Sequence, residues 1–236
     1  MQITVSEKKR FKIIKVTGSL DDSQSSAFKK TVNEAIYSGA DNILLDLNAV
    51  SEIGRNSLGM ILQFLKLVIE KSGTLYLLAS PPIKQKYLSS NLEKIIRIFE
   101  SNEEFEKEVI NAAKQKLNIL VRRHEKYFII DILEELNVSS NLEDLAEVLD
   151  KLLQQNYKFI ALNLSRIMHL YSQTIGLLIK RYKMIKALNG DLCIFGLNEE
   201  ITGLLGNMHL DRLLALYPTE SDFIKKIEKA SQEEHK

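Results

Sequence analysis

The chain has 236 residues, of which 45% are hydrophobic and 27% charged, a balance typical of a globular protein with room for one large or two ordinary domains. Lys and Arg total 32 against 31 Asp and Glu, so the net charge of +1 removes the electrostatic argument for a nucleic-acid partner. No run approaches the ~18 apolar residues of a membrane-spanning helix, and the one cysteine, Cys193, excludes an intramolecular disulfide and favours a cytoplasmic location.

Hydrophobic periodicity divides the first half of the chain into alternating strands and helices. Short β-rich runs predict strands, and apolar residues at helical spacing, such as Leu58, Ile61, Leu62 and Leu65, predict amphipathic helices. In order, the sequence predicts strands over 3–5 and 11–16, a helix over 23–37, a strand over 43–47, a helix from 58 that stops at 72–73, a strand over 75–79, a short helix that follows Pro81-Pro82 and ends near 89, a strand over 95–99 and a helix over 103–113.

The second half gives the same order of elements. Strands that alternate with helices imply parallel pairing through right-handed crossovers. The acidic pairs Glu103-Glu104 and Glu199-Glu200 are interpreted as helix starts, where negative charge favours the helix dipole. The predicted elements are strands over 118–122 and 127–133, a helix over 142–153, a strand over 159–164, a helix over 175–187, strands over 192–195 and 213–217, and a helix over 222–230.

The two halves match one another at a spacing of about 117 positions. Residues 58–61 fall on 175–178, and Gly73 falls on Gly190, each glycine just before a strand-like run; one residue is inserted before the last strand. A tandem repeat explains this shared order, and a chance alignment of two ordinary α/β domains is the alternative. The predicted domains are 1–113 and 118–236, joined by a short linker over 114–117.

Residues that would carry chemistry are dispersed along the chain. None of the four histidines has a second histidine at i+4 or another ligand type at metal-binding spacing, and the glycines form no phosphate-binding loop. His169 is interpreted as a polar loop residue. We therefore expect no catalytic site, no metal and no cofactor, with an enzyme whose residues are scattered through the fold as the alternative.

The loop before the long helix is the informative place in each half. Over 45–59 and again over 162–176, a buried strand leads through small polar residues into an amphipathic helix. Such a turn lies at the carboxyl end of a strand and points backbone N–H groups outward from the helix start. This geometry suits an anion or an acidic partner.

In this loop and in its order of elements, the chain resembles the STAS family, the bacterial anti-anti-sigma-factor domains that also occur on sulfate transporters. Family members carry a Leu-Asp-Leu strand and, a few residues later, Asp-Ser-Ser/Thr-Gly-Leu-Gly at the helix start; here 45–47 is Leu-Asp-Leu and 58–59 is Leu-Gly. The resemblance covers both halves. It implies an α/β fold of two tandem STAS-like domains, each a small, mostly parallel sheet with an antiparallel N-terminal edge, backed by helices.

The resemblance also implies a partner such as an anti-sigma-factor or kinase-like protein. In the family, a partner kinase phosphorylates a serine at the helix start, which switches binding off. Matched on Leu58-Gly59, this serine falls on Asn56 and the family's aspartate falls on Gly54. Matched on Ile175-Gly176 in the second half, they fall on Gln173 and Tyr171. Because an amide cannot accept a phosphoryl group, we expect a partner to meet a permanently neutral surface in both halves.

Three hydroxyl groups lie beside these amides, on Ser57, Ser172 and Thr174. They are either displaced phosphorylation sites or, the interpretation we favour, helix caps and solvent-exposed groups. Arg55 opposes the helix dipole by about 0.3–1 kcal/mol, which indicates an acidic group on a partner unless the side chain turns into water. The candidate partner-binding residues are Gly54, Arg55, Asn56, Ser57, Tyr171, Ser172, Gln173 and Thr174.

The sequence thus favours a non-catalytic protein-interaction module of a bacterial partner-switching or sigma-factor regulatory system. The alternative is a sensor that binds a small anionic ligand or nucleotide at the helix N-termini. A homodimer is left open. Because the first half keeps Asp46 and Gly18 of the family pattern, we expect it to be the binding half.

Overall fold

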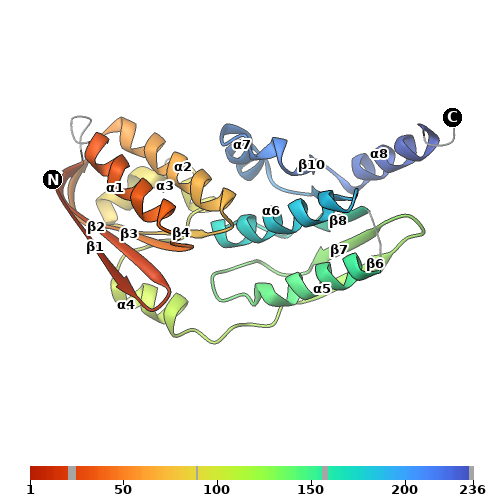
Figure 1. Cartoon of the computed structure of the whole chain (residues 1–236), viewed down its shortest axis with the longest axis horizontal. Helices are drawn as coiled ribbons and strands as arrows, with labels where there is room; N and C mark the ends of the chain where they lie inside the picture. Colours follow the sequence, from red (N-terminus) through yellow and green to blue (C-terminus); the bar gives the residue numbers. More distant parts are fainter. Residues whose placement is uncertain (21–24, 89, 156–158, 234–236) are drawn as a thin grey trace. The chain divides into compact units, whose positions relative to one another are not determined.

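The computed structural model describes residues 1–20, 25–88, 90–155 and 159–233, which divide between two compact units (Figure 1). Each unit is built on one five-stranded sheet. Unit 1 comprises Met1–Lys114, Asn137–Ser139 and Leu170–Leu177, and unit 2 comprises Gln115–Leu136, Ser140–His169 and Leu178–Lys236.

The strands of unit 1 lie side by side in sequence order, as Figure 1 shows for the red to yellow part of the chain. The first two strands pair antiparallel, and all later neighbours pair parallel, so a helix crosses over between successive parallel strands. The elements are β1 (Gln2–Lys8), β2 (Phe11–Leu20), α1 (Ser25–Tyr37), β3 (Asn42–Ile53), α2 (Arg55–Glu70), β4 (Thr74–Leu78), α3 (Pro81–Leu88), the 3-10 turn η2 (Leu92–Lys94), β5 (Ile98–Phe99), α4 (Asn102–Phe105) and the π-helical turn η3 (Glu106–Ile110).

Unit 2 repeats this topology, with an antiparallel first pair and parallel pairing after it. The predicted fold class is therefore confirmed in both halves. The elements are β6 (Ile119–Arg123), β7 (Phe128–Ile132), α5 (Leu142–Gln154), β8 (Phe159–Asn163), α6 (Ser172–Ala187), β9 (Asp191–Phe195), α7 (Glu199–Asn207), η4 (Leu210–Arg212), β10 (Ala215–Tyr217) and α8 (Glu220–Glu233); the start of α6, to Leu177, belongs to unit 1.

Each sheet is buried on both faces, which explains why its central strands are continuous apolar runs. In unit 1, α1 and α2 meet through Phe28 and Phe64, whose rings pack edge to face at 5.4 Å. A separate aromatic cluster includes Phe11, Tyr76 and Phe105 and joins β2 and β4 to α4. In unit 2, Phe223 of α8 packs in the corresponding cluster with residues of β7, β8 and β9.

Gly73 shows why the turn between α2 and β4 requires glycine. A Cβ atom at this position would lie 2.4 Å from the carbonyl oxygen of Asp41, closer than any real contact. The same carbonyl accepts the N–H of Thr74 at 2.6 Å and so fixes the entry into β4. The helix end that the sequence placed at 72–73 is therefore set by this close approach.

The largest difference from the predicted elements is in β2 and β3. The sequence predicted strands ending at 16 and 47, but β2 continues to Leu20 and β3 to Ile53, so most of the predicted loop is strand. The two extensions pair with one another from Thr17↔Ala49 to Leu20↔Ile53, with one register shift before Thr17 and a second between Gly18 and Ser19. In the second half, β7 and β8 end at Ile132 and Asn163, and the predicted loop is irregular.

Other boundaries differ for local reasons. The strands predicted from 95 and 213 begin only at Ile98 and Ala215, because the residues before them close the 3-10 turns η2 and η4. The last helix of the first half is short and continues as a π-helical turn to Ile110 rather than as an α-helix to 113. The predicted start of the first helix at 23 and the predicted end near 89 lie outside the described residues.

Candidate functional site

The start of α2 is formed by a direct passage from β3 into the helix. Gly54 occupies the N-cap position in an extended conformation and makes no side-chain cap hydrogen bond. Its N–H donates to the carbonyl oxygen of Leu20 at 3.0 Å, so the end of β2 holds the helix start in place. The long β2–β3 pair therefore positions the first turn of α2.

Ser57 lies on the inner side of this turn. Its side chain is fully buried, and its hydroxyl donates to the Leu20 carbonyl oxygen at 3.0 Å. The hydroxyl therefore neither caps the helix nor meets solvent, which corrects the interpretation made from the sequence. This buried, bonded hydroxyl fastens α2 to β2.

Asn56 lies on the outer side of the same turn and is exposed, as is Gly59 one turn later. The backbone of Arg55 begins the helix, and its side chain lies outside the described part of the structure. The first turn of α2 carries no acidic residue. The exposed polar side chain that the structure describes at this helix start is the Asn56 amide.

The start of α6 is built differently, because it is packed inside unit 1. The side chains of Ser172 and Thr174 are 1% and 2% exposed. The Ser172 hydroxyl accepts the N–H of Leu75 at 3.1 Å and donates to the carbonyl oxygen of the same residue at 3.2 Å. Its backbone N–H donates to Ile95 at 3.0 Å. Ser172 thus completes the hydrogen bonding of β4 instead of capping a helix.

Gln173 and Tyr171 are partly buried at the same place. The Gln173 side-chain oxygen accepts the Tyr76 hydroxyl at 3.1 Å, and its nitrogen donates to the Asn137 carbonyl oxygen at 3.2 Å. Tyr171 packs against the aromatic cluster of unit 1. Both ends of the Gln173 amide are therefore occupied, whereas no hydrogen bond of the Asn56 side chain is found among the described residues.

The two helix starts do not form one surface. A Cβ at Gly176, in the first turn of α6, would lie 3.1 Å from the carbonyl oxygen of Gly73, so α6 begins beside the carboxyl end of α2. With 16 residues at about 1.5 Å per residue, α2 separates its own start from this place by about 24 Å. The eight residues singled out in the sequence therefore lie at two separate places, and Asn56 is the one among them that the structure describes as exposed.

Asp46, which the sequence analysis used to favour the first half, has a structural role that the second half shares. Its carboxylate accepts the N–H of Asn48 at 3.0 Å, and Asn163 accepts the N–H of Ser165 at 3.1 Å. Each side chain closes a turn over its own backbone two residues on. The aspartate itself does not distinguish a binding half from a structural half.

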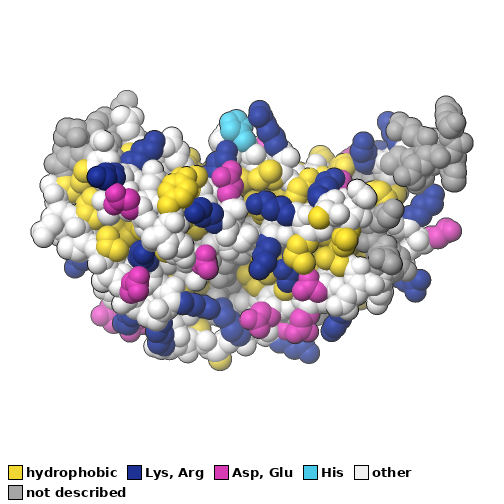
Figure 2. Space-filling model, viewed as in Figure 1, with side chains coloured by type: hydrophobic (Ala, Val, Ile, Leu, Met, Phe, Trp, Pro, Cys, Tyr) yellow, Lys and Arg dark blue, Asp and Glu magenta, His cyan; other side chains and the backbone are white. Residues whose placement is uncertain are grey.

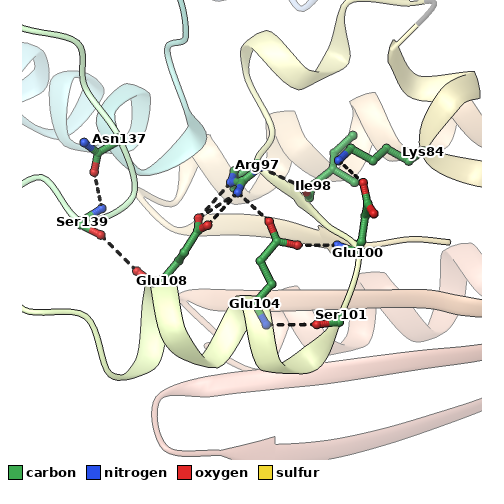
Figure 3. Close-up of polar contacts among 9 residues, drawn as sticks. All are labelled: Lys84, Arg97, Ile98, Glu100, Ser101, Glu104, Glu108, Asn137 and Ser139. Carbon is green, nitrogen blue, oxygen red and sulfur yellow. Dashed lines mark hydrogen bonds and ion pairs between the residues drawn. The ribbon is translucent and has the colours of Figure 1, made fainter. Parts of the chain in front are cut away.

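Charged side chains away from the helix starts form closed clusters. In Figure 3, Arg97 faces Glu104 and Glu108, and it is 2.9 Å from a carboxylate oxygen of each. Burial lowers the pKa of Arg97, but hydrogen bonding to Glu108 and the two negative charges outweigh this and raise it. This cluster attaches α4 and η3 to the strand β5.

Unit 2 has a corresponding cluster around Arg122. Its guanidinium contacts Asp131 at 2.6 Å and Glu220 at 2.8 Å, and Asn163 donates to the same aspartate at 2.7 Å. The Arg122 hydrogen bond lowers the pKa of Glu220, and hydrogen bonds from Arg122 and Asn163 outweigh burial and lower the pKa of Asp131. Carboxylates held ionised in this way are not suited to donate protons at neutral pH.

Two further reactive side chains, His169 and Cys193, are occupied or shielded. His169 lies in a loop, as expected, with its Nδ1 3.1 Å from Glu135. Burial raises the pKa of the Cys193 thiol to about 12, so this thiol is a poor nucleophile near neutral pH. Within the described ranges, no group of three or more His, Cys, Asp and Glu could hold a metal ion, and no helix is long and apolar enough to cross a membrane.

Basic and acidic side chains are interspersed over the visible face of the described residues (Figure 2).

The sequence could not reveal which residues form hydrogen bonds with the two helix starts. Ser57 bonds to Leu20, and the start of α6 bonds to Leu75, Tyr76 and Ile95. They lie 37 or more positions away from the residues they bind, and three of them are apolar in side chain and act through their backbone.

The STAS domain family matches residues 2–105 and 118–223 of the chain. Among solved structures, an anti-sigma factor antagonist from Mycobacterium paratuberculosis is 15% identical, and the alignment covers 44% of this chain and 88% of that chain with a TM-score of 0.41. An anti-sigma-factor antagonist (STAS) domain protein from Planctomyces limnophilus is 18% identical over 48% of this chain and 98% of that chain, with a TM-score of 0.41. The Bacillus cell fate determinant SpoIIAA in its phosphorylated form is 21% identical over 44% and 95%, with a TM-score of 0.38.

Proposed function

Because this chain belongs to the STAS domain family, with a match in each half, we propose that it is a non-catalytic module that binds a regulatory protein of a bacterial partner-switching or sigma-factor system. The proposed contact surface is the start of α2 around the exposed Asn56, with Gly54 and Arg55 before it, and Ser57 fixes this turn from inside. The partner is a protein of the anti-sigma-factor or kinase-like class.

The exposed amide of Asn56 is the observation that carries this proposal. It occupies the place where the resemblance puts a phosphorylated serine, and the adjacent hydroxyl of Ser57 is buried and bonded to Leu20. A phosphoryl group would add about −1.5 to −2 charges at such a site. Without an accessible acceptor, the surface keeps one charge state, and binding is constitutive.

In this proposal, the start of α6 has an internal role. Tyr171, Ser172, Gln173 and Thr174 are bonded or packed within unit 1, and a partner could reach the Ser172 hydroxyl only by breaking its bonds to Leu75 of β4. The first repeat is therefore the binding half, on grounds of exposure rather than of Asp46. The second repeat keeps the helix start but uses it as a structural element.

The absence of a catalytic role is supported by the charge clusters. Two carboxylates whose pKa is lowered by a cation, Asp131 and Glu220, are bound to Arg122 and hold α8 on the sheet. Such pairing is typical of structural ion pairs, which also perturb pKa values. We infer that the protein acts by binding.

Affinity capture from the source cell, with three forms of the full chain as bait, tests the proposal. The wild-type chain should retain a regulatory protein, whereas Asn56→Asp should lose it, because the new charge imitates a phosphorylated surface. Asn102→Asp is the matched control, since Asn102 is also exposed in the first turn of a helix of unit 1. Equal capture by all three forms would contradict the proposed surface.

A second variant tests the missing switch. Asn56→Ser restores a hydroxyl at the exposed position, so incubation with the captured kinase-like partner and ATP should add one phosphoryl group and release the complex. The wild-type chain should gain none under the same conditions. Phosphorylation of the wild-type chain at Ser57 would overturn the assignment of that hydroxyl to the core.

The alternative of an anion sensor gains no support at α6, because the Ser172 N–H already donates to Ile95. At α2 the uncapped N-terminus is a general property of helices. A titration with inorganic phosphate and ATP, followed by the backbone amide signals of residues 54–57, separates the two functions. Saturable shifts at these amides without any protein partner would favour the sensor.

A further inference from the structure

The two repeats differ at the carboxyl end of their last two parallel strands. In unit 1, Lys84 of α3 and Glu100 after β5 form an ion pair at 2.7 Å, visible at the right of Figure 3. Lys84 is the fourth residue of its helix, and Glu100 directly follows its strand. The ion pair bridges the helix and the strand end.

Unit 2 has neither charge at the matching positions. The fourth residue of α7 is Thr202, and the residue after β10 is Pro218. The loop from β9 to α7 has one residue more than its counterpart, three residues against two. Gly196 makes this longer loop possible, because it adopts φ +82° and a Cβ there would lie 2.9 Å from the Ser165 side chain.

A cavity of about 490 Å³ opens at this place in unit 2. Its walls are mostly apolar, from Ile194 and Leu216 on the strands, the inserted Leu197, and Pro218. The volume lies within the range of small-molecule sites, and the carboxyl ends of parallel strands are where α/β folds bind ligands. The repeat thus provides its own comparison: an ion pair in one copy and an apolar pocket in the other.

The polar side chains of the pocket indicate the charge of its occupant. Glu199 and Thr202, both exposed, lie on the first turn of α7 and line the cavity. Within the described ranges no salt bridge joins Glu199 to a cation, so its carboxylate is open to a positively charged group. An anionic ligand would meet this carboxylate as a like charge.

We propose that unit 2 binds a small molecule with an aromatic or branched aliphatic body and a cationic end, the body against Ile194, Leu197 and Leu216 and the cation at Glu199. The site is independent of the α2 surface, because all its residues belong to unit 2. It adds a ligand-binding function to the repeat whose own helix start is buried.

Titration of the ¹⁵N-labelled full chain with three matched probes tests this site. Tryptamine carries an aromatic body with a cation, indole carries the body alone, and indole-3-acetate carries it with an anion. Tryptamine should bind tightest and indole-3-acetate weakest, with shifts at the amides of Leu197, Thr202 and Leu216. The absence of shifts at these amides with all three probes would overturn the site, and tighter binding of indole-3-acetate would overturn the cationic preference.

Variants of exposed residues separate binding from folding. Glu199→Gln should weaken tryptamine about three- to fivefold and leave indole unchanged, the loss expected for a surface ion pair. Thr202→Lys with Pro218→Glu transfers the ion pair of unit 1 and should abolish binding of all three probes. Thr202→Tyr fills the cavity from an exposed position and should also abolish binding of all three probes. It serves as the test if the double variant does not fold. Full retention of indole and tryptamine binding in a folded Thr202→Tyr chain would overturn the pocket.

Discussion

Ser57 offers a direct test of how the start of α2 is built. Ser57→Ala removes one hydrogen bond to the Leu20 carbonyl oxygen, but this oxygen keeps the N–H of Gly54 at 3.0 Å. No buried acceptor is left without a partner, so the loss is that of one ordinary hydrogen bond, about 1 kcal/mol of the free energy of unfolding. Partner binding through Asn56 should be unchanged.

Ser57→Asp is a much larger perturbation of the same site. The Ser57 side chain is fully buried, so a carboxylate there loses its hydration and faces a carbonyl oxygen that it cannot bind while ionised. The expected loss is about 3–5 kcal/mol, the size measured for uncompensated buried charges. Asn56→Asp places the same charge one residue earlier, at an exposed position, and should stabilise the helix by about 0.3–1 kcal/mol.

Urea denaturation of the three variants and the wild-type chain measures these differences in the free energy of unfolding. Hydrogen exchange of the α2 amides, used as the readout, assigns them to unit 1. From the most to the least stable, the order should be Asn56→Asp, the wild-type chain, Ser57→Ala and Ser57→Asp. If Ser57→Asp is within about 1 kcal/mol of Ser57→Ala, the hydroxyl is accessible, and the argument that a kinase cannot reach it fails.

Three further predictions concern the framework around the two helix starts. Ser172→Ala should destabilise β4 by about 1–3 kcal/mol, because the hydroxyl both accepts and donates there, and faster hydrogen exchange of the β4 amides checks this. Gly73→Ala should lower the midpoint of thermal unfolding, since its Cβ would meet a carbonyl oxygen at 2.4 Å; an unchanged midpoint would show that the turn adapts. The folded state lowers the pKa of Asp131 and Glu220, so their contribution is present above the ordinary carboxyl pKa of about 4 and is lost as the pH falls through the lowered values. The protection of the β7 amides, relative to their intrinsic exchange rate at each pH, should therefore fall below about pH 4, and Arg122→Ala should flatten this dependence while weakening unit 2 at pH 7.

The strands and the main helices could be predicted because their signals are local. The buried run 43–47 and the helical stripe of α2 carry their periodicity in adjacent residues, and both lie where the pattern placed them. The acidic pairs at 103–104 and 199–200 also mark true helix starts. Repetition of these local signals in both halves was enough to predict the fold class.

The extension of β3 could not be predicted, because it depends on a partner strand. Residues 48–53 are mixed and partly exposed, and they become strand only because β2 continues beside them through two register shifts. The second half has the same type of sequence after β8, but its neighbour β7 ends at Ile132, and the segment stays irregular. Whether such a segment is strand or loop is decided by contacts that are distant in the sequence.

Only part of the candidate site could be predicted from the sequence, for the same reason. The sequence placed both helix starts, since these follow from Leu58-Gly59 and Ile175-Gly176. It could not tell which start is exposed, because burial of Ser172 and Gln173 depends on Leu75 and Tyr76, 97 positions away. The hydroxyl of Ser57 was interpreted as a cap from local rules, whereas it bonds to Leu20 across the sheet.

Complex formation in the presence of ATP is the most direct test of a constitutive binding surface. The measurement is the dissociation constant of the full chain with its captured regulatory protein, with and without ATP, together with the intact mass of the chain before and after. The account predicts the same dissociation constant and the same mass in both conditions. A gain of one phosphoryl group in the wild-type chain, with weaker binding, would contradict it.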